Sequence, residues 1–111
     1  MSDSLRIDRW LFFCRFFKTR SKASAAVTGG HVRLNSERAA PGARVQVGDH
    51  IELVRDRLPF SLKVRGIPAR RGPAPEARAC YDEDEAVVRE RELKTAALRQ
   101  DRLLMPRTDG K

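Results

Sequence analysis

Cationic side chains gather around one short segment near the start of the chain, residues 18–22, with the sequence KTRSK. Lys18, Arg20 and Lys22 flank the expected beginning of a helix, where free backbone amides already favour a phosphate group. Cations at this end oppose the helix dipole, so helix stability does not explain them. The wider basic set is Arg6, Arg9, Arg15, Lys18, Arg20, Lys22, Arg33 and Arg38. We interpret it as a binding site for a polyanion, the alternative being an ordinary solvated face.

Two neighbours of this set carry side chains that hydrogen-bond well to nucleotides. His31 follows a double glycine, and Asn35 lies two residues beyond Arg33 on the outward side of an expected strand. Both could bond to base or sugar edges of a nucleic acid. The alternatives are a neutral exposed histidine and an asparagine that only forms a turn.

Five aromatic rings between Trp10 and Phe17 invite comparison with the platforms on which nucleic-acid bases stack. Their helical spacing beside aliphatic residues favours packing in a core instead. We expect one ring, Phe13 or Phe16, to remain exposed.

Other chemistry has few residues to support it. The chain shows no serine–histidine–acid arrangement and no glycine-rich phosphate loop. His31, His50, Cys14 and Cys80 have no metal-ligand spacing, and the two cysteines form no CxxC pair. The sequence therefore predicts no enzymatic activity, no metal and no cofactor, and it favours a reducing intracellular setting.

Composition points to an acidic partner. The 111 residues carry 23 lysines and arginines against 15 acidic residues, a net charge of +8. By our count residues 1–66 hold 13 of these cations and 6 of the acids, so the excess lies in the front half. Charge alone does not choose between RNA, DNA and lipid, but we expect no membrane partner, because the aromatic helix lacks a polar face. Because no signal peptide or membrane-spanning stretch is evident, we expect a cytoplasmic protein.

Periodicity and turn signals predict an α+β fold. A helix capped by Asp8 should run from Arg9 to before Lys18, and a second, capped by Thr19, should end at Gly29–Gly30. Alternating apolar residues then predict about four short strands in a curled antiparallel sheet, at 32–34, 45–47, 51–53 and 60–64. The helix pair should cover one side of this sheet.

The predicted domain organisation has four parts: residues 1–66 as the folded domain, 67–81 as a proline- and arginine-rich connector, 82–105 as a C-terminal helix, and 106–111 as a tail. Asp82 should cap that last helix. Its apolar stripe is thin, so we expect it to be mostly solvated, to dock along an edge or on a partner, and to be dispensable for folding of residues 1–66.

Four segments, RIDRWL, RFFKTRSKA, GGHVRLN and VGDHIEL, resemble the S4-type RNA-binding domain, whose two-helix αL motif packs on a small sheet. Together with ARRGPAPEARACYDED and LLMP they make the chain similar to the ribosome-associated heat shock protein 15 family. That resemblance implies binding to structured ribosomal RNA of the large subunit. It further implies recycling or quality control of stalled subunits that carry nascent chain–tRNA, without chemistry of its own. Apart from the resemblance, we expect a monomer.

The resemblance implies that nine residues contact RNA: Arg6, Arg9, Arg15, Lys18, Thr19, Arg20, Lys22, Arg33 and Asn35. Arg38 joins them from the basic set. One departure from the family pattern is Ser36, which stands where an Asn-Gly turn is usual, so the first hairpin turn should be looser.

Two other functions stay open at this point. A pair of short helices can imitate a helix-turn-helix, which would make the chain a DNA-binding regulator. That reading needs base-contacting side chains on the second helix, which offers mainly alanine, serine and lysine. The domain could also be a module that targets an RNA-modifying enzyme.

Overall fold

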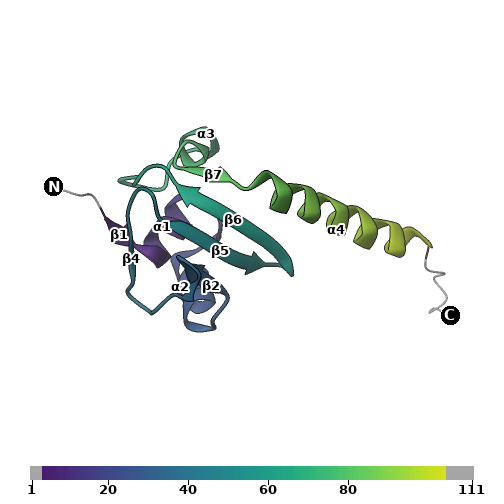
Figure 1. The fold of residues 1–111 in the computed structure, drawn as a ribbon, viewed down its shortest axis with the longest axis horizontal. Coiled ribbons are helices and arrows are strands. Elements are labelled where there is room, and N and C mark those ends of the chain that lie inside the picture. The colour runs from purple at the N-terminus through teal and green to yellow at the C-terminus, as the bar shows by residue number, and fades with distance from the viewer. Residues whose placement is uncertain (1–3, 105–111) are drawn as a thin grey trace.

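The computed structural model describes residues 4–104 and shows a helix pair packed on a curled sheet, with a long C-terminal helix extending away from them (Figure 1). The elements follow one another as β1 (Leu5–Arg6), α1 (Ile7–Phe13), α2 (Arg20–Thr28), β2 (Val32–Leu34), β3 (Glu37–Arg38), β4 (Arg44–Val45), β5 (His50–Arg55), β6 (Leu58–Val64), α3 (Ala74–Arg78), β7 (Tyr81–Glu83) and α4 (Glu85–Leu104). The predicted α+β class is confirmed.

The strands form two separate antiparallel sheets. Five strands pair in the order β3-β2-β5-β6-β7, and β1 pairs with β4 in a small second sheet. The predicted strand at 45–47 is therefore not part of the main sheet, because Val45 pairs with Leu5 instead. Three strands, β1, β3 and β7, were missed because each is too short to show an alternating pattern of its own.

One helix of the pair, α1, begins and ends at other residues than predicted. α1 starts at Ile7 rather than Arg9 and ends at Phe13, so Asp8 lies inside its first turn. Thr19 caps α2 as predicted, because its Oγ1 accepts from the backbone N of Lys22 at 3.0 Å. The stop at the double glycine is also confirmed, with Gly30 at a φ of +82°.

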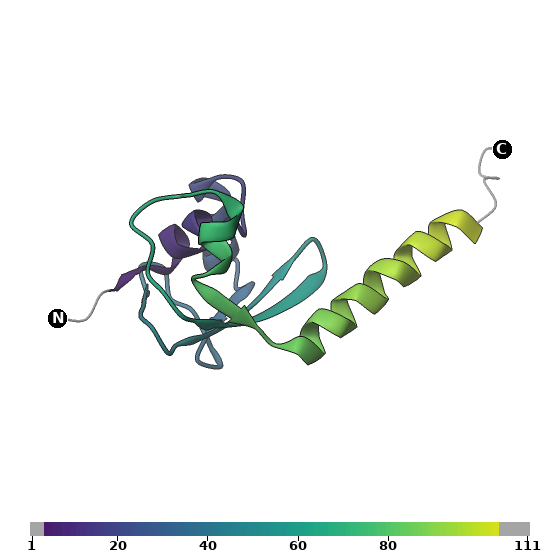
Figure 2. The ribbon, with the colours of Figure 1, turned by 90° about the horizontal axis from the view of Figure 1, so that it is seen from above.

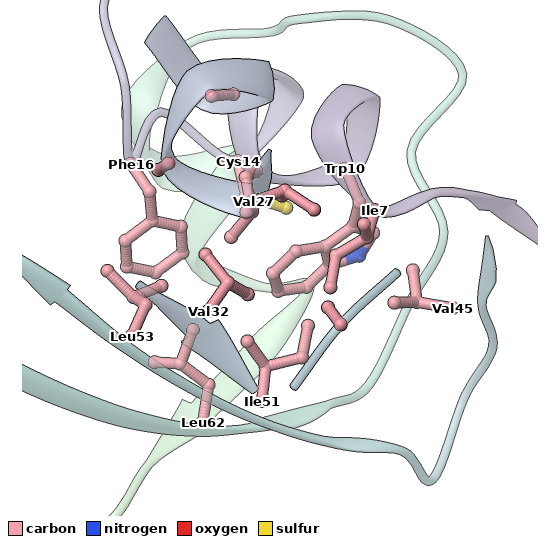
Figure 3. Packing of buried hydrophobic residues seen from close by; sticks show 14 of the residues in the cluster. Ile7, Trp10, Cys14, Phe16, Val27, Val32, Val45, Ile51, Leu53 and Leu62 are labelled. Atoms are coloured by element: carbon pink, nitrogen blue, oxygen red, sulfur yellow. The ribbon is translucent and has the colours of Figure 1, made fainter. Parts of the chain in front are cut away.

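The core joins α1 and α2 to the inner face of the sheet (Figure 3). Trp10 and Leu11 of α1 are fully buried, and they meet the equally buried Val32, Ile51 and Leu62 of the strands in one cluster. Removing such large apolar side chains from water is the main stabilising term. The indole Nε1 of Trp10 donates to Gly66 O at 3.0 Å, so its polar atom is satisfied.

Packing in the core, rather than base stacking, accounts for the aromatic rings between Trp10 and Phe17. Phe16 is only 5% exposed, and its ring lies 4.9 Å from Tyr81 and 6.1 Å from Trp10. We expected either Phe13 or Phe16 to remain exposed, but Phe16 is buried and Phe13 is half-buried.

The first hairpin turn is tight, contrary to the loose turn expected from Ser36. Asn35 and Ser36 both adopt positive φ angles, 52° and 73°, and Leu34 pairs directly with Glu37. This is the two-residue geometry that matches strand twist. The β5–β6 turn at Asp56 and Arg57 has the same character, with φ angles of 54° and 67°.

The segment predicted as an extended connector contains regular structure. Helix α3 forms within it, and β7 pairs with β6 in the register Leu62–Glu83. Asp82 consequently lies in a strand, and Asp84 takes the predicted capping role because its Oδ1 accepts from Ala86 N at 2.9 Å. The division of the chain into four parts stays a prediction. Among the described residues, no helix is both long and apolar enough to span a bilayer.

Candidate nucleic-acid interface

An open groove of about 910 Å³ lies between the helix pair and the tip of the β5–β6 hairpin. We call it groove 1, defined by the α1–α2 turn (residues 15–18), α2 with His31, and the hairpin tip (residues 54–57). Its charged lining residues are the cations Arg15, Lys18, Lys22, Arg55 and Arg57 and the single carboxylate Asp56. Such an excess of cations over carboxylates attracts a polyanion.

The N-terminal turn of α2 gives groove 1 its most accessible cations. Lys18 and Lys22 are exposed on either side of Thr19. The Thr19 Oγ1 accepts one hydrogen bond in the helix cap, which leaves its O–H able to donate to a phosphate oxygen. Because lysine side chains are long and mobile, both ammonium groups can follow a phosphate backbone across the groove.

Asp8 organises two of the predicted arginines beside this turn. Arg6 donates from Nε and Nη2 to the two carboxylate oxygens of Asp8 at 3.2 Å each, and Arg20 Nη2 lies 4.0 Å from Oδ2. Burial alone raises the pKa of the Asp8 carboxyl. The hydrogen bonds from Arg6 and from Arg9 N, with the charges of Arg6 and Arg20, outweigh burial, so its pKa is lowered overall. Asp8 therefore stays ionised and holds these guanidinium groups in place.

The α1–α2 turn is held by arginines that come from distant parts of the chain. Arg55 Nη1 donates to Phe16 O at 2.7 Å. Arg71 donates to Phe12 O at 3.0 Å and to Phe17 O at 3.3 Å, and its guanidinium lies 4.7 Å from the Phe12 ring centre. One of these carbonyl groups, Phe12 O, lies in the last turn of α1, and the other two lie in the turn that follows. The turn that carries Lys18 is thus fixed by residues outside the helix pair.

Arg15 combines an exposed position with a tether. It adopts a φ of 69°, which few residues other than glycine favour, and its Nη1 donates to Gly72 O at 2.8 Å. This bond ties the end of α1 to the segment before α3. Arg9 is exposed on α1 and does not line groove 1.

The predicted residues of the first hairpin do not line groove 1, and two of them, Asn35 and Arg38, bond within the fold. Asn35 Nδ2 donates to Asp49 at 3.2 Å, and its Oδ1 accepts from His50 N at 2.9 Å, which makes it a structural turn residue. Arg38 Nη2 donates to Thr28 O at 2.8 Å and its guanidinium packs on Gly30. Arg33 is exposed opposite Arg38 on the neighbouring strand.

Groove 1 thus brings together Arg15, Lys18 and Lys22 from the predicted set, with His31, and adds two arginines that the sequence did not single out. Arg55 and Arg57 come from the β5–β6 hairpin, far from KTRSK in sequence. The segment RDRL (residues 55–58) did indicate that these arginines reach the surface, since a turn at Asp56 exposes the residues flanking it. The packing of the hairpin against the helix pair could not be read from that segment.

Reactive groups are sparse in the described part of the chain. Residues 4–100, whose side chains are described, contain no group of three or more metal-binding side chains. Cys14 and Cys80 are free, and burial raises the pKa of the Cys14 thiol, with Cys80 nearby adding to the rise. His50 Nε2 lies 2.7 Å from Ser61 Oγ, a pair that satisfies the buried serine within the sheet.

Comparisons with known proteins agree with this architecture. Residues 5–51 match the model of the S4 domain family. Over 105 residues the chain is 36% identical to the heat shock protein 15 homolog of Haemophilus influenzae, covering 95% of this chain and 80% of that protein. Heat shock protein 15 of Escherichia coli K12 is 33% identical over 105 residues, with 95% and 79% covered. A solved structure of Vibrio cholerae heat shock protein 15, described as trimeric, matches with a TM-score of 0.79 at 37% identity, covering 88% of this chain and 98% of that one.

Proposed function

Because the chain belongs to the heat shock protein 15 family and carries an S4 domain, we propose that it binds structured ribosomal RNA through groove 1. The observation that supports this most directly is the lining of groove 1, where five cations face one carboxylate beside the N-terminus of α2. Phosphate groups are the natural partners of such an arrangement. The protein acts by binding alone.

The proposed partner is the large ribosomal subunit in the cytoplasm, in the state where a stalled nascent chain is still attached to tRNA. This finer role rests on the family resemblance of the sequence, and the groove supports its RNA-binding part. In this role the protein marks or stabilises the free subunit during recycling or quality control. Neither the S4 match nor the names of the relatives supports the DNA-binding alternative.

Sedimentation of cell extracts through sucrose gradients tests the ribosomal partner. We expect the full chain to travel with large subunits at low salt and to be released as salt rises. Crosslinking in cells, followed by sequencing of the attached RNA, then locates the site. A protein that stays at the top of the gradient at every salt concentration would contradict the proposal.

A single substitution tests the site itself. Lys22→Ala should lower affinity for ribosomal RNA by about threefold to tenfold, equivalent to the loss of one phosphate contact, without changing the melting temperature. Lys63→Ala is the matched control, because Lys63 is exposed on β6 and does not line groove 1. Equal binding by the two variants in a filter-binding assay would remove groove 1 from the proposal. A parallel titration with duplex DNA separates RNA from DNA binding.

The oligomeric state is a separate part of the proposal. The sequence predicts a monomer, which stays a prediction, whereas the Vibrio cholerae relative is described as trimeric. Sedimentation velocity of the full chain, with and without RNA, distinguishes a monomer from a trimer like the one described for that relative.

A further inference from the structure

A second groove, of about 450 Å³, lies on the other side of the β5–β6 hairpin. We call it groove 2, defined by Arg55, Leu58 and Phe60 of the hairpin and by the α4 face that carries Arg91, Thr95 and Arg99. Figure 2 shows the hairpin and α4 as two arms that diverge from the sheet, with the helix pair beyond the hairpin. The hairpin is therefore a ridge with a groove along each side.

Arg91 fixes the far wall of groove 2. Its Nη1 donates to Pro59 O at 3.0 Å, its Nη2 pairs with Glu83 at 2.8 Å, and its guanidinium lies 4.0 Å from the Phe60 ring centre. These contacts attach the first turns of α4 to the sheet and fix the angle between the helix and the sheet. Residues four apart share a helix face, so Arg99 extends the same face two turns further along α4.

Both grooves are cationic, and they share one residue. Arg55 lines groove 1 and groove 2, while Arg57 stands at the tip between them. Groove 2 is lined by Arg55, Arg91 and Arg99 and by the carboxylate Glu92, and Arg91 is also paired with Glu83 beside the groove. The same charge that favours phosphate in groove 1 thus continues over the hairpin onto α4.

Arg57 occupies a backbone position that glycine would fill at lower cost. Its φ of 67° lies in the left-handed region, which disfavours residues with a Cβ. The side chain is exposed, so packing does not explain why an arginine stands there. Its guanidinium stands at the tip of the hairpin, where it can meet a phosphate group.

We propose that the β5–β6 hairpin inserts between two backbone strands of one folded RNA, with one strand in groove 1 and the other in groove 2. Arg57 and Arg55 contact the backbone from the ridge, and Arg99 contacts the second strand from α4. This inference rests on the proposed function and deepens it, because it specifies a double-stranded or junction-like RNA rather than a single strand. Helix α4 is then part of the RNA-binding surface.

Fluorescence anisotropy with the full chain tests the second strand. The probes are a labelled RNA stem–loop and a single-stranded RNA of the same length. Arg99→Ala should weaken binding to the stem–loop by about threefold to tenfold and reduce its salt slope by roughly one, with the single strand unaffected. Arg89→Ala is the matched control, since it removes the same charge from an exposed position of α4 that lines neither groove.

Arg57→Gly provides a second test, in which RNA affinity and melting temperature should change in opposite directions. Both probes should bind about threefold to tenfold more weakly, while the melting temperature rises because the left-handed strain is relieved. A residue with only a structural role would not give that combination.

Three outcomes would overturn the inference. Stem–loop binding by Arg99→Ala and Arg57→Gly equal to that of the unmodified chain would remove the hairpin from the RNA surface. If Arg99→Ala changed the sedimentation of the protein but not its RNA affinity, groove 2 would be a contact surface for a second copy of the chain. The first result would leave RNA binding only to the helix-pair side of groove 1, and the second would leave the proposed function unchanged. Failure of the unmodified chain to bind either probe would reject the inference and the proposed function together.

Discussion

At the scale of single residues, the predicted basic set divides by what each side chain already contacts. Lys18 and Lys22 reach into groove 1 from exposed positions, whereas Arg6 is paired with Asp8 and Arg38 is bonded to Thr28 O. A guanidinium that is committed to a carboxylate contributes charge to the surface, but fewer free donors to a ligand. The RNA-binding contribution of a cation in this family member therefore depends on its intramolecular partners.

Asp8→Asn tests the ion cluster that supports the site. The carboxyl is 4% exposed and its pKa is lowered in the folded protein, so its contribution to stability is present above the unfolded pKa and is lost as pH falls through the folded value. We expect the substitution to lower the free energy of unfolding by roughly 1 to 3 kcal/mol at neutral pH. This difference should shrink below about pH 4, near the ordinary pKa of aspartate.

Urea unfolding of both proteins across that pH range measures the effect. Asp56→Asn is the control, because this carboxylate is 85% exposed and its removal should change stability by less than about 0.5 kcal/mol. A pH-independent difference between Asp8→Asn and the unmodified chain would contradict the assignment.

At the scale of elements, two tight hairpins place non-glycine residues at positive φ. The Asn35–Ser36 turn sets the register of β2 with β3, and the Asp56–Arg57 turn presents the ridge between the grooves. Local strain is retained at both turns because strand pairing on either side determines the backbone.

Ser36→Gly should stabilise the protein. Glycine adopts a φ of 73° without the clash that a Cβ causes, so we expect the free energy of unfolding to rise by about 0.5 to 1 kcal/mol. Ser24→Gly in the middle of α2 should act in the opposite direction, since glycine disfavours a helix interior. Thermal melts of the two variants should shift to opposite sides of the unmodified chain. Shifts of equal sign would show that the turn is not strained.

Truncation tests which elements the core requires. The sequence predicts that the C-terminal helix is dispensable for residues 1–66, and the structure shows that residues beyond 66 also pack on the sheet. β7 adds a strand to the sheet, and its Tyr81 ring packs 4.9 Å from Phe16. We expect residues 1–84 to unfold cooperatively without α4, and residues 1–66 to lose the cooperative transition. Circular dichroism melts decide this, and a cooperative melt of residues 1–66 would contradict it.

At the scale of the whole molecule, the cationic surface runs from the helix pair over the hairpin to α4. The net charge of +8 gives this surface a long-range field that favours encounter with RNA. If about six phosphates are neutralised, the logarithm of affinity should fall against the logarithm of salt concentration with a slope of roughly −4 to −5. Titrations of the full chain with ribosomal RNA at several salt concentrations measure this slope. A slope near zero would mean that the charged surface does not carry binding.

The sequence by itself determined the features that depend on neighbouring residues. The Thr19 cap, the glycine stop of α2, the α+β class and the family resemblance all follow from short motifs, because caps and turns are satisfied within a few residues. Only the tertiary structure decided which cations share a groove and which are engaged elsewhere. Arg55 and Arg71 meet the α1–α2 turn across separations of 39 to 59 residues, and such contacts depend on strand pairing and core packing that no local pattern encodes.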